Sequence, residues 1–536
     1  MVVGADLMGA IPLGAAAEWI AQTGGSYLHA AYTRPPAIAF GVVADLGQIV
    51  LPADLAKRDP LARYSLPWTA GISWSNSVNV TDFPAESIDQ SLELAQRALG
   101  AKGGVVFFPA GVFYFRDSIR LRDGIVLRGV DSAIPDARSD AYRPQTCFEF
   151  PRYRPTFEGR GTPIDSAFKG IVLDSPKASN CGILDIAVNR GHVDFASAEG
   201  NATGRNRFVV GCTFSNAAVA DPAIPDRTIP QHPWQRFTAR HHPAVRVAAF
   251  ENVLVANNRI PKSGDDSFTM KDYIVRDAAI SEVVFDYDNR PGIYVNDATL
   301  GGPGGDGPDG NPDTHPAGFR KGLVIRDNYV FCTGRCAIAF SGDGTICSNN
   351  VIRFEDNIYR PTVTGTSVSK GSSTNDNRAV QMRGWRWTVE NNDYEVYRNI
   401  CHDRVYRIND GEGLMHEDHA NCTVFDSRLI NNRGNSYLSI FKTGGINGLV
   451  VRGNDIRTPG GISAIYVVAD KNSGRYQCRN VTIEDNTTAG SGIEIGGSPA
   501  SGNVVRNNRH SGPGGRLINR ADAAVEGNTG YEPASK

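Results

Sequence analysis

The residues best suited to chemistry are two adjacent carboxylates in the middle of the chain. Asp265 and Asp266 belong to the segment Ser263–Tyr273, which reads SGDDSFTMKDY. Two carboxyl groups a few ångströms apart do not both ionise easily, so one stays protonated at neutral pH and can donate to a leaving oxygen. The pair therefore predicts general acid and general base catalysis. The alternative is an Asp pair in a turn that caps backbone amides.

Other acidic residues follow this pair at distances that suggest a common groove. Asp288, in FDYDN, lies 22 residues after Asp266, and Asp343, in FSGDG, follows after a long insertion. If 22 residues correspond to one structural repeat, acids from adjacent repeats will line one face. Asp288 and Asp343 are therefore predicted to assist the pair.

A second titratable cluster lies in GEGLMHEDHAN, residues 411–421, which contains His416, Glu417, Asp418 and His419. Such a density of groups suits a general base with an orienting partner, or a divalent metal site. We predict that His416 and Glu417 take part in catalysis and that His419 contacts the substrate. An exposed polar turn is the alternative.

Basic and aromatic residues are the third kind of candidate, because they bind acidic groups and stack on sugar rings. The alternatives are solvated surface charges and ordinary strand residues. The predicted substrate contacts are Lys271, Arg320, Arg335, Tyr294 and Trp385. Arg290, Lys321, Lys442, Trp387, Tyr394 and Tyr397 belong to the same basic and aromatic sets.

The elements that must position these residues are revealed by a repeat in the C-terminal part of the chain. Short alternating segments end in Asn again and again, as in VIRDN at Asn328, CSNN at Asn350, LINN at Asn432 and VRGN at Asn454. The same sequence pattern also ends at Asn486, Asn508 and Asn528. Several of the intervals are 22 residues. A fixed period in the low twenties is typical of a solenoid.

The composition of the repeats selects the kind of solenoid. Segments such as GLVIRD, GLVVRG and NVTIED alternate apolar and polar residues and are rich in Val and Ile, so they predict strands. Helical periodicity is not present in every repeat. We therefore predict an all-β fold, a right-handed parallel β-helix, in which the repeated Asn side chains form a hydrogen-bonded ladder at the strand spacing of roughly 4.8 Å.

The start of the solenoid is predicted by a helix and the strands behind it. PAESIDQSLELAQRALG, residues 84–100, places Ile88, Leu92, Ala95 and Leu99 on one face and predicts an amphipathic capping helix. GGVVFFPAGVFYFRDSIRLRDGIVLRGV, residues 103–130, predicts the first strands. Helix and strands together resemble the first module of the pectate-lyase-like superfamily, which implies the same β-helix. That superfamily includes hydrolases, lyases, epimerases and tailspikes.

The segment around Asp265 and Asp266 supplies a second, more local resemblance. SGDDSFTMKDY resembles the Gly-Asp-Asp strand of β-helix hydrolases of the polygalacturonase and dextranase type. The resemblance implies that neighbouring aspartates act as general acid and base. Several β-helix lyases are similar in using basic residues and Ca²⁺ for β-elimination, so a lyase that uses Lys271 or Arg335 with His416 or His419 is the alternative.

Charge and cysteine content exclude some classes of function. Lys+Arg 55 against Asp+Glu 57 gives a net charge of −2, so no overall basic field predicts nucleic-acid binding. No apolar run is long enough to span a bilayer. The odd number of cysteines, 9, is scattered along the chain and favours buried small apolar residues over disulfides.

The predicted organisation is an N-terminal extension, residues 1–80, packed on a β-helix, residues 81–530, with insertions near 301–319 and 358–380. GGPGGDGPDGNPDTHP, residues 301–316, is interpreted as a flexible loop, with Ca²⁺ binding through Asp306, Asp309 and Asp313 as the alternative. Residues 360–378 are rich in Ser, Thr and Gly and are expected to be mobile. Long loops on one face of a β-helix would form the walls of its substrate groove.

The sequence therefore predicts a glycoside hydrolase that cleaves a polysaccharide or oligosaccharide by single displacement. A polysaccharide lyase and a non-catalytic carbohydrate-binding spike or adhesin are the alternatives. No cofactor is required by this chemistry, and Ca²⁺ is an optional one. We expect an extracellular or periplasmic protein without a nucleic-acid or membrane partner; the oligomeric state is left open.

Overall fold

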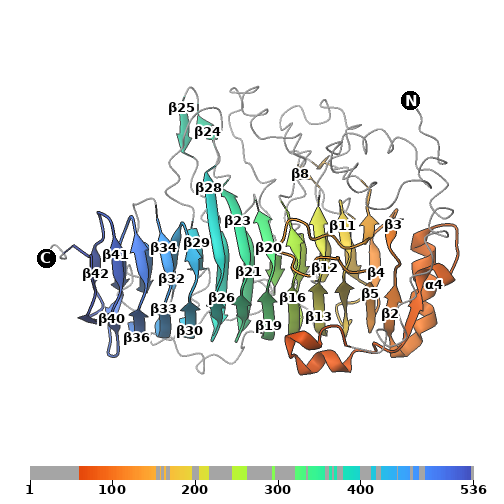
Figure 1. The fold of residues 1–536 in the computed structure, drawn as a ribbon, viewed down its shortest axis with the longest axis horizontal. Coiled ribbons are helices and arrows are strands. Elements are labelled where there is room, and N and C mark those ends of the chain that lie inside the picture. The colour runs from red at the N-terminus through yellow and green to blue at the C-terminus, as the bar shows by residue number, and fades with distance from the viewer. Residues whose placement is uncertain are drawn as a thin grey trace. The chain divides into compact units, whose positions relative to one another are not determined.

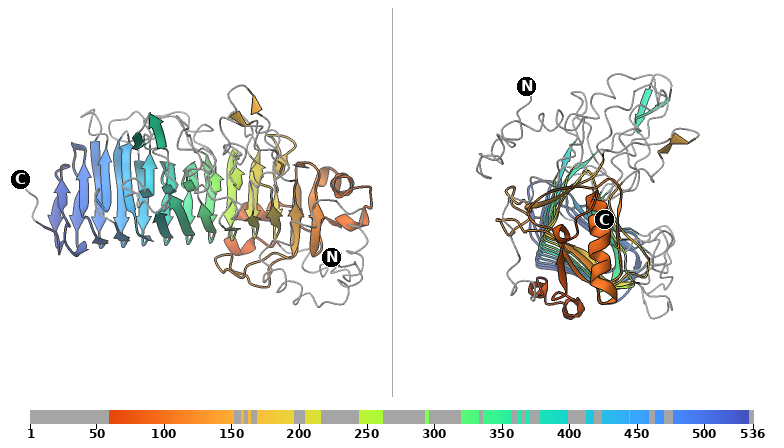
Figure 2. Two further views of the ribbon diagram at one scale, coloured as in Figure 1. Left: turned by 90° about the horizontal axis from the view of Figure 1, so that it is seen from above. Right: turned by 90° about the vertical axis from the view of Figure 1, so that its right-hand side faces the viewer.

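The computed structural model describes one large unit of the chain. The residues described are 59–151, 157–158, 162–163, 169–195, 204–215, 244–261, 293–295, 320–332, 336–356, 361–364, 367–370, 378–398, 412–417, 424–443, 445–458, 463–469 and 477–532. Parallel strands stack coil on coil (Figure 1), and an end-on view shows that they enclose a common interior (Figure 2). The predicted right-handed parallel β-helix is confirmed.

Each complete coil contributes one strand to each of three faces, which we name A, B and C. Face A consists of β1 Ser77–Asn79, β2 Gly104–Phe107, β5 Ile125–Arg128, β10 Cys181–Leu184, β13 Arg205–Val210, β16 Glu251–Ala256, β19 Lys321–Arg326, β22 Ile346–Ser348, β27 Thr388–Glu390, β30 Val424–Ile430, β33 Ile446–Arg452, β36 Gln477–Glu484, β40 Val504–Arg506 and β43 Ala524–Glu526. Face B is the 12-stranded sheet: β3 Gly111–Tyr114, β6 Thr146–Glu149, β11 Ala187–Asn189, β14 Thr213–Ser215, β17 Arg259–Ile260, β20 Tyr329–Cys332, β23 Val351–Asp356, β28 Asp393–Arg398, β31 Arg433–Gly434, β34 Asp455–Arg457, β37 Thr487–Ala489 and β41 Arg509–Ser511.

Face C carries the candidate site. It consists of β4 Ile119–Leu121, β9 Ile171–Leu173, β12 Val193–Phe195, β15 Val245–Val247, β18 Ile293–Val295, β21 Cys336–Asp343, β26 Arg378–Trp385, β29 Glu412–Glu417, β32 Tyr437–Thr443, β35 Ile465–Ala469, β38 Ile493–Gly496 and β42 Leu517–Asn519. The remaining strands are β39 Ser498–Pro499 beside β36, and two antiparallel pairs, β7 Phe157–Glu158 with β8 Thr162–Pro163 and β24 Pro361–Thr364 with β25 Ser367–Lys370. Part of the predicted mobile insertion is therefore a hairpin, β24–β25.

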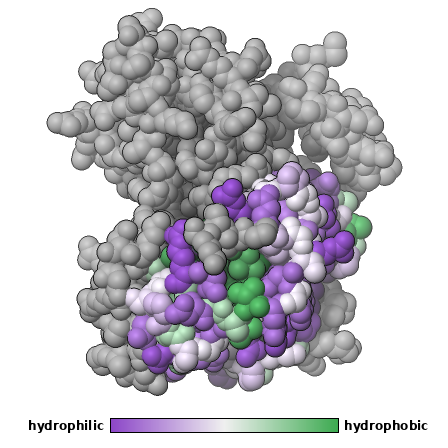
Figure 3. Space-filling model, turned by 90° about the vertical axis from the view of Figure 1, so that its left-hand side faces the viewer, coloured by the Kyte–Doolittle hydropathy of each residue, from purple (hydrophilic) through white to green (hydrophobic). Residues whose placement is uncertain are grey.

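The first coil is closed by the predicted helix. Helix α4, Ile88–Leu99, begins at Ser87, whose hydroxyl accepts from the Gln90 amide, and ends at Gly100 with φ 62°. Its four predicted apolar residues are all buried in the main core. Short 3₁₀ helices flank it at Ala62–Tyr64, Pro67–Gly71, Val80–Asp82 and Gly100–Lys102. At the other end, Figure 3 shows a hydrophobic strip between hydrophilic residues, and Val525 on β43 is exposed.

The Asn ladder lies inside the turn between faces A and B. Its members are Asn258, Asn328, Asn350, Asn392, Asn432, Asn454, Asn486, Asn508 and Asn528. Each side-chain amide donates to the Oδ1 of the next Asn, for example at 3.0 Å from Asn392 to Asn432. The residue before each ladder Asn has positive φ, as Asn349 does at 56°, a conformation that Asn, Asp and Gly tolerate best.

Nonpolar side chains fill the interior and also cover part of the exterior. The main core runs through every coil, and the free cysteines Cys181, Cys212, Cys347 and Cys478 are buried, as predicted, whereas Cys147 is only partly buried. On the outer side of face A, Trp74 and its neighbours pack over Phe208, Leu254 and Val324. This covered stretch ends at β19, because Ile346 on β22 is 41% exposed. Residues 1–58 of the predicted extension lie outside the described residues.

One corner residue makes stability dependent on pH. Asp185 has φ 57° at the turn between faces A and B. The pKa of its carboxyl is raised to about 7, mainly by burial; Arg128 opposes this rise and Asp131 adds to it. The folded state therefore favours the protonated carboxyl. Its stabilising contribution is complete below the ordinary pKa of 3.8 and is lost as the pH rises through about 7.

Asp185→Asn keeps a residue that tolerates positive φ and removes the ionisation. We expect the melting temperature of the variant at pH 8 to exceed that of wild type by on the order of a few °C. Between pH 4 and pH 8, the melting temperature of the variant should fall less than that of wild type. Asp485→Asn, at an exposed corner with φ 55°, is the matched control and should leave that fall unchanged. Parallel pH profiles for wild type and Asp185→Asn would contradict the assignment.

Candidate active site

A row of residues runs along the outer side of face C, with one position per coil. In register order it contains Asp194, Arg246, Tyr294, Ala339, Gln381, Met415, Ser439, Tyr466 and Glu494. The positions on either side of this row face the interior, as the buried Val380 and Met382 show beside Gln381. Successive residues of a strand point to opposite faces, so this row, which we call the C row, belongs to the outer surface.

Charged pairs mark both ends of the C row. Arg246 Nη1 lies 3.5 Å from Asp194 Oδ2, and Arg520 Nη1 lies 3.1 Å from Glu494 Oε1. Burial, with a smaller contribution from Glu494, raises the pKa of the Tyr466 hydroxyl. Tyr466 therefore remains a neutral hydrogen-bonding group at physiological pH, next to a carboxylate.

The described side chains at the centre of the C row are shielded from water. Ala339, Gln381 and Ser439 are each 5% exposed or less, and Ser341, two residues after Ala339, is 2% exposed. Hydrogen bonds and charges act more strongly where water is excluded. The chemistry of this row is therefore suited to orienting the hydroxyl groups of a ligand.

Asp343 lies at the end of β21, where faces C and A meet. It accepts hydrogen bonds from Arg386 Nε, at 2.6 Å, and from Arg386 Nη2, while Lys321 Nζ is 3.9 Å away. Arg386 has φ 50°, a strained conformation for a long side chain. The two-pronged ion pair stabilises this corner and favours a structural role for Asp343 over the predicted catalytic one.

The register of β29 separates His416 from Glu417. His416 is aligned with Met382 on one side and Ile440 on the other, and both of these are fully buried in the core. Glu417, the next residue, alternates to the opposite side of the strand. Its position therefore belongs to the same side of face C as the C row. The register favours Glu417 over His416 as a groove residue, and the roles of both remain predictions.

The remaining described candidates lie in different settings. The Arg320 guanidinium lies 4.9 Å from the centre of the Phe250 ring, and Arg205 lies 5.0 Å from the same ring. Trp385 is 2% exposed and packs against Phe425. Trp387 lies wholly in the interior, as the ordinary-strand interpretation of WRWTVE predicts, and Tyr394 is buried as well.

Six predicted site residues lie outside the described residues: Asp265, Asp266, Lys271, Asp288, Arg335 and His419. Chain connectivity still relates most of them to face C. Residues 262–292 join β17 of face B to β18 of face C, and residues 333–335 join β20 to β21 in the same way. In the sequence, the predicted acid pair therefore falls between β17 and β18.

Sequence reasoning missed most of the C row. The signal was present, because every residue of the row except Met415 is the centre of a short apolar–X–apolar strand, for example VDF for Asp194, VQM for Gln381, LSI for Ser439 and IEI for Glu494. In the described parts of the chain, no group of three His, Cys, Asp or Glu residues could hold a metal ion. Among the helices described, none is long and apolar enough to cross a membrane.

Comparison with known proteins gives structural similarities only. No family model matches the chain, and no curated protein matches it. The A-module of mannuronan C-5 epimerase AlgE6 from Azotobacter vinelandii is similar at 13% identity, 85% coverage of this chain, 99% of that chain and a TM-score of 0.38. The catalytic unit of a GH87 α-1,3-glucanase from Streptomyces thermodiastaticus is similar at 16% identity, with 86% of this chain and 70% of that chain covered and a TM-score of 0.41. The tailspike of E. coli bacteriophage HK620 is similar at 13% identity, with 84% of this chain and 72% of that chain covered and a TM-score of 0.44.

Proposed function

We propose that this protein is an enzyme that degrades a polysaccharide along the outer side of face C. The observation that carries the proposal is the C row, in which seven of nine positions across neighbouring coils are polar, charged or aromatic and the other two are Ala339 and Met415. Adjacent strands are roughly 4.8 Å apart, which is comparable with the length of one sugar residue in an extended chain. A polymer lying across the strands would meet the partly exposed Asp194, Arg246 and Glu494. It would reach Ala339, Gln381 and Ser439 only once their covering is displaced, because they are at most 5% exposed.

Glycoside hydrolysis is the first choice of reaction. Asp265 and Asp266 would act as acid and base, and Glu417 is the better placed of the two β29 candidates to assist them. Asp194, Gln381, Ser439, Tyr466 and Glu494 would bind hydroxyl groups on either side of the scissile bond. We further propose an extracellular or periplasmic location, where polysaccharides are found.

β-Elimination is the second choice, because Arg246 and Arg383 provide basic groups on face C, in addition to Lys271 and Arg335, which the sequence predicts for this reaction. A guanidinium beside a uronate carboxylate would stabilise the charge that develops when the neighbouring proton is removed. This reaction requires a uronic-acid polymer, whereas hydrolysis does not.

A panel of neutral and uronic polysaccharides tests the proposal. We expect new reducing ends without absorbance from an unsaturated product. Reducing ends together with that absorbance would establish the lyase instead. Binding without either signal would leave the non-catalytic spike or adhesin, and would contradict an enzymatic function.

A further inference from the structure

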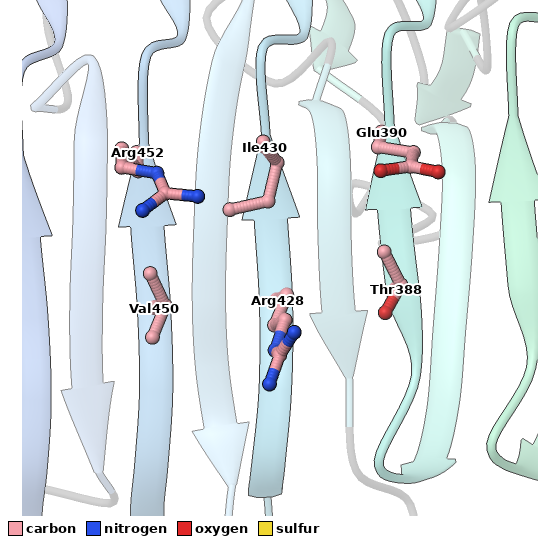
Figure 4. Close-up of a pocket in the computed structure, with 6 residues that line it drawn as sticks. All are labelled: Thr388, Glu390, Arg428, Ile430, Val450 and Arg452. Carbon is pink, nitrogen blue, oxygen red and sulfur yellow. The ribbon is translucent and has the colours of Figure 1, made fainter.

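A pocket on face A lies on a different side of the coil from the C row. It is lined by Thr388 and Glu390 on β27, Arg428 and Ile430 on β30, and Val450 and Arg452 on β33, and has a volume of about 350 Å³. Ile430 lies between Arg452 and Glu390 (Figure 4). The pocket occupies coils beyond β19, where the apolar covering of face A has ended. It therefore opens on a surface that the proposed polysaccharide groove does not use.

The charges that line this pocket are poorly neutralised by the protein. Neither Arg428 nor Glu390 has an ion-pair partner among the described residues, although they lie on adjacent strands. Their register explains this: Glu390 is opposite Ile430, whereas Arg428 is opposite Thr388. The two charged residues are thus diagonal neighbours with Cα atoms roughly 8 Å apart.

Arg452 is also available to a ligand. Its Nη1 is 3.9 Å from Glu484 Oε1, at the outer limit of an ion pair, and its side chain is 54% exposed. Glu484 is already occupied by Arg506, whose Nε and Nη2 donate at 2.9 Å and 2.7 Å. The same face thus forms a close ion pair where the register permits one. Arg452, one strand away from Glu484, and Arg428, two strands away, retain free hydrogen-bonding capacity.

The combination of groups identifies the chemistry of the ligand. Two guanidinium groups match a carboxylate or sulfate, because their paired N–H donors fit such oxygens. Glu390 would repel a bare anion but would accept hydrogen bonds from hydroxyl groups, and Thr388 can do both. Ile430 and Val450 provide an apolar floor for the C–H face of a ring.

We propose that this pocket is a second, non-catalytic binding site for an acidic saccharide, with Arg428 and Arg452 on its carboxylate or sulfate and Glu390 on its hydroxyls. The choice of a saccharide rests on the proposed function, whereas the anionic class follows from the pocket itself. A site of this kind would hold an acidic polymer on face A while another stretch of it, or another chain, occupies face C.

The test reads the pocket directly in the full-length protein by methyl NMR. The methyl signals of Ile430 and Val450 are followed during titration with a uronic-acid tetrasaccharide and with the same tetrasaccharide after reduction of its carboxyl groups. We expect saturable shifts with the uronate form and a loss of affinity of about tenfold or more in Arg428→Gln/Arg452→Gln. Arg457→Gln on face B, whose guanidinium is engaged by Asp455, is the matched control and should bind as wild type does.

Several outcomes would overturn the proposal. They are unchanged Ile430 and Val450 signals, equal binding of the reduced tetrasaccharide, and equal or tighter binding of inorganic sulfate or of an acidic glutamate peptide. Glu390→Gln distinguishes a sugar ligand from a bare anion, since it should weaken binding of the uronate tetrasaccharide and strengthen binding of sulfate. The polysaccharide panel is run on the same samples. Methyl shifts without cleavage would contradict the proposed function alone, and cleavage without methyl shifts would contradict the face A site alone.

Discussion

Asp265→Asn and Asp266→Asn are each expected to lower kcat about 10²–10⁴-fold on the polysaccharide that the wild-type enzyme cleaves. Asparagine keeps the size of the side chain but can neither give up nor take on the proton that glycosidic cleavage requires. In a single-displacement reaction both carboxyl groups are needed at the same step, so neither variant should retain substantial turnover. Initial rates of reducing-end release measure the effect, and thermal melting confirms that the variants are folded.

Asp343→Asn is the matched control for this prediction, because it makes the same chemical change in a carboxyl group held by Arg386. It should lower the melting temperature, since Arg386 loses the partner that stabilises its positive φ, while kcat falls far less than in the paired-acid variants. Wild-type turnover in Asp265→Asn and Asp266→Asn would show that the assigned acids are wrong. A loss of kcat in Asp343→Asn as large as theirs would instead support the catalytic role predicted for Asp343.

The repeat could be predicted from the sequence wherever coils have similar lengths. Asn432, Asn454, Asn486 and Asn508 are separated by 22 or 32 residues, and the structure places all of them in the ladder. Asn258 and Asn392 were not predicted, because insertions place their neighbours 70 and 42 residues away. Their local phrases, VANN and VENN, match the pattern, so phrase matching without a fixed period would have found both.

The site was less predictable than the fold for a physical reason. Stacking of β-helix coils depends on inward apolar residues and corner residues, which leave a periodic signal. Outward residues such as Gln381 and Ser439 are free to vary in type, so only their register reveals that they share a row. Conversely, the density of titratable groups around His416 suggested catalysis, but density does not show on which side of a strand a residue lies. Alignment with Met382 and Ile440 supplies that information.

Asn432→Ala is expected to cost about 3–5 kcal/mol in the free energy of unfolding, because several buried polar groups lose their partners at once. Asn432 Oδ1 accepts from the backbone amide and the side-chain amide of Asn392, at 3.1 Å and 3.0 Å, and its own Nδ2 donates to the Val389 carbonyl at 2.9 Å. The matched control is Asn528→Ala at the partly exposed end of the ladder. Asn528 Oδ1 likewise accepts from the backbone amide and the side-chain amide of Asn508, but there water can replace the lost hydrogen bonds. Each repeat of a solenoid contacts only its neighbours, so a break at Asn432 separates two blocks of coils, whereas a break at Asn528 frays one end.

Urea unfolding should therefore show a large fall in midpoint for Asn432→Ala and a small one for Asn528→Ala. Equal midpoints for the two variants would mean that stability comes from the apolar interior alone, and that the ladder contributes only to register.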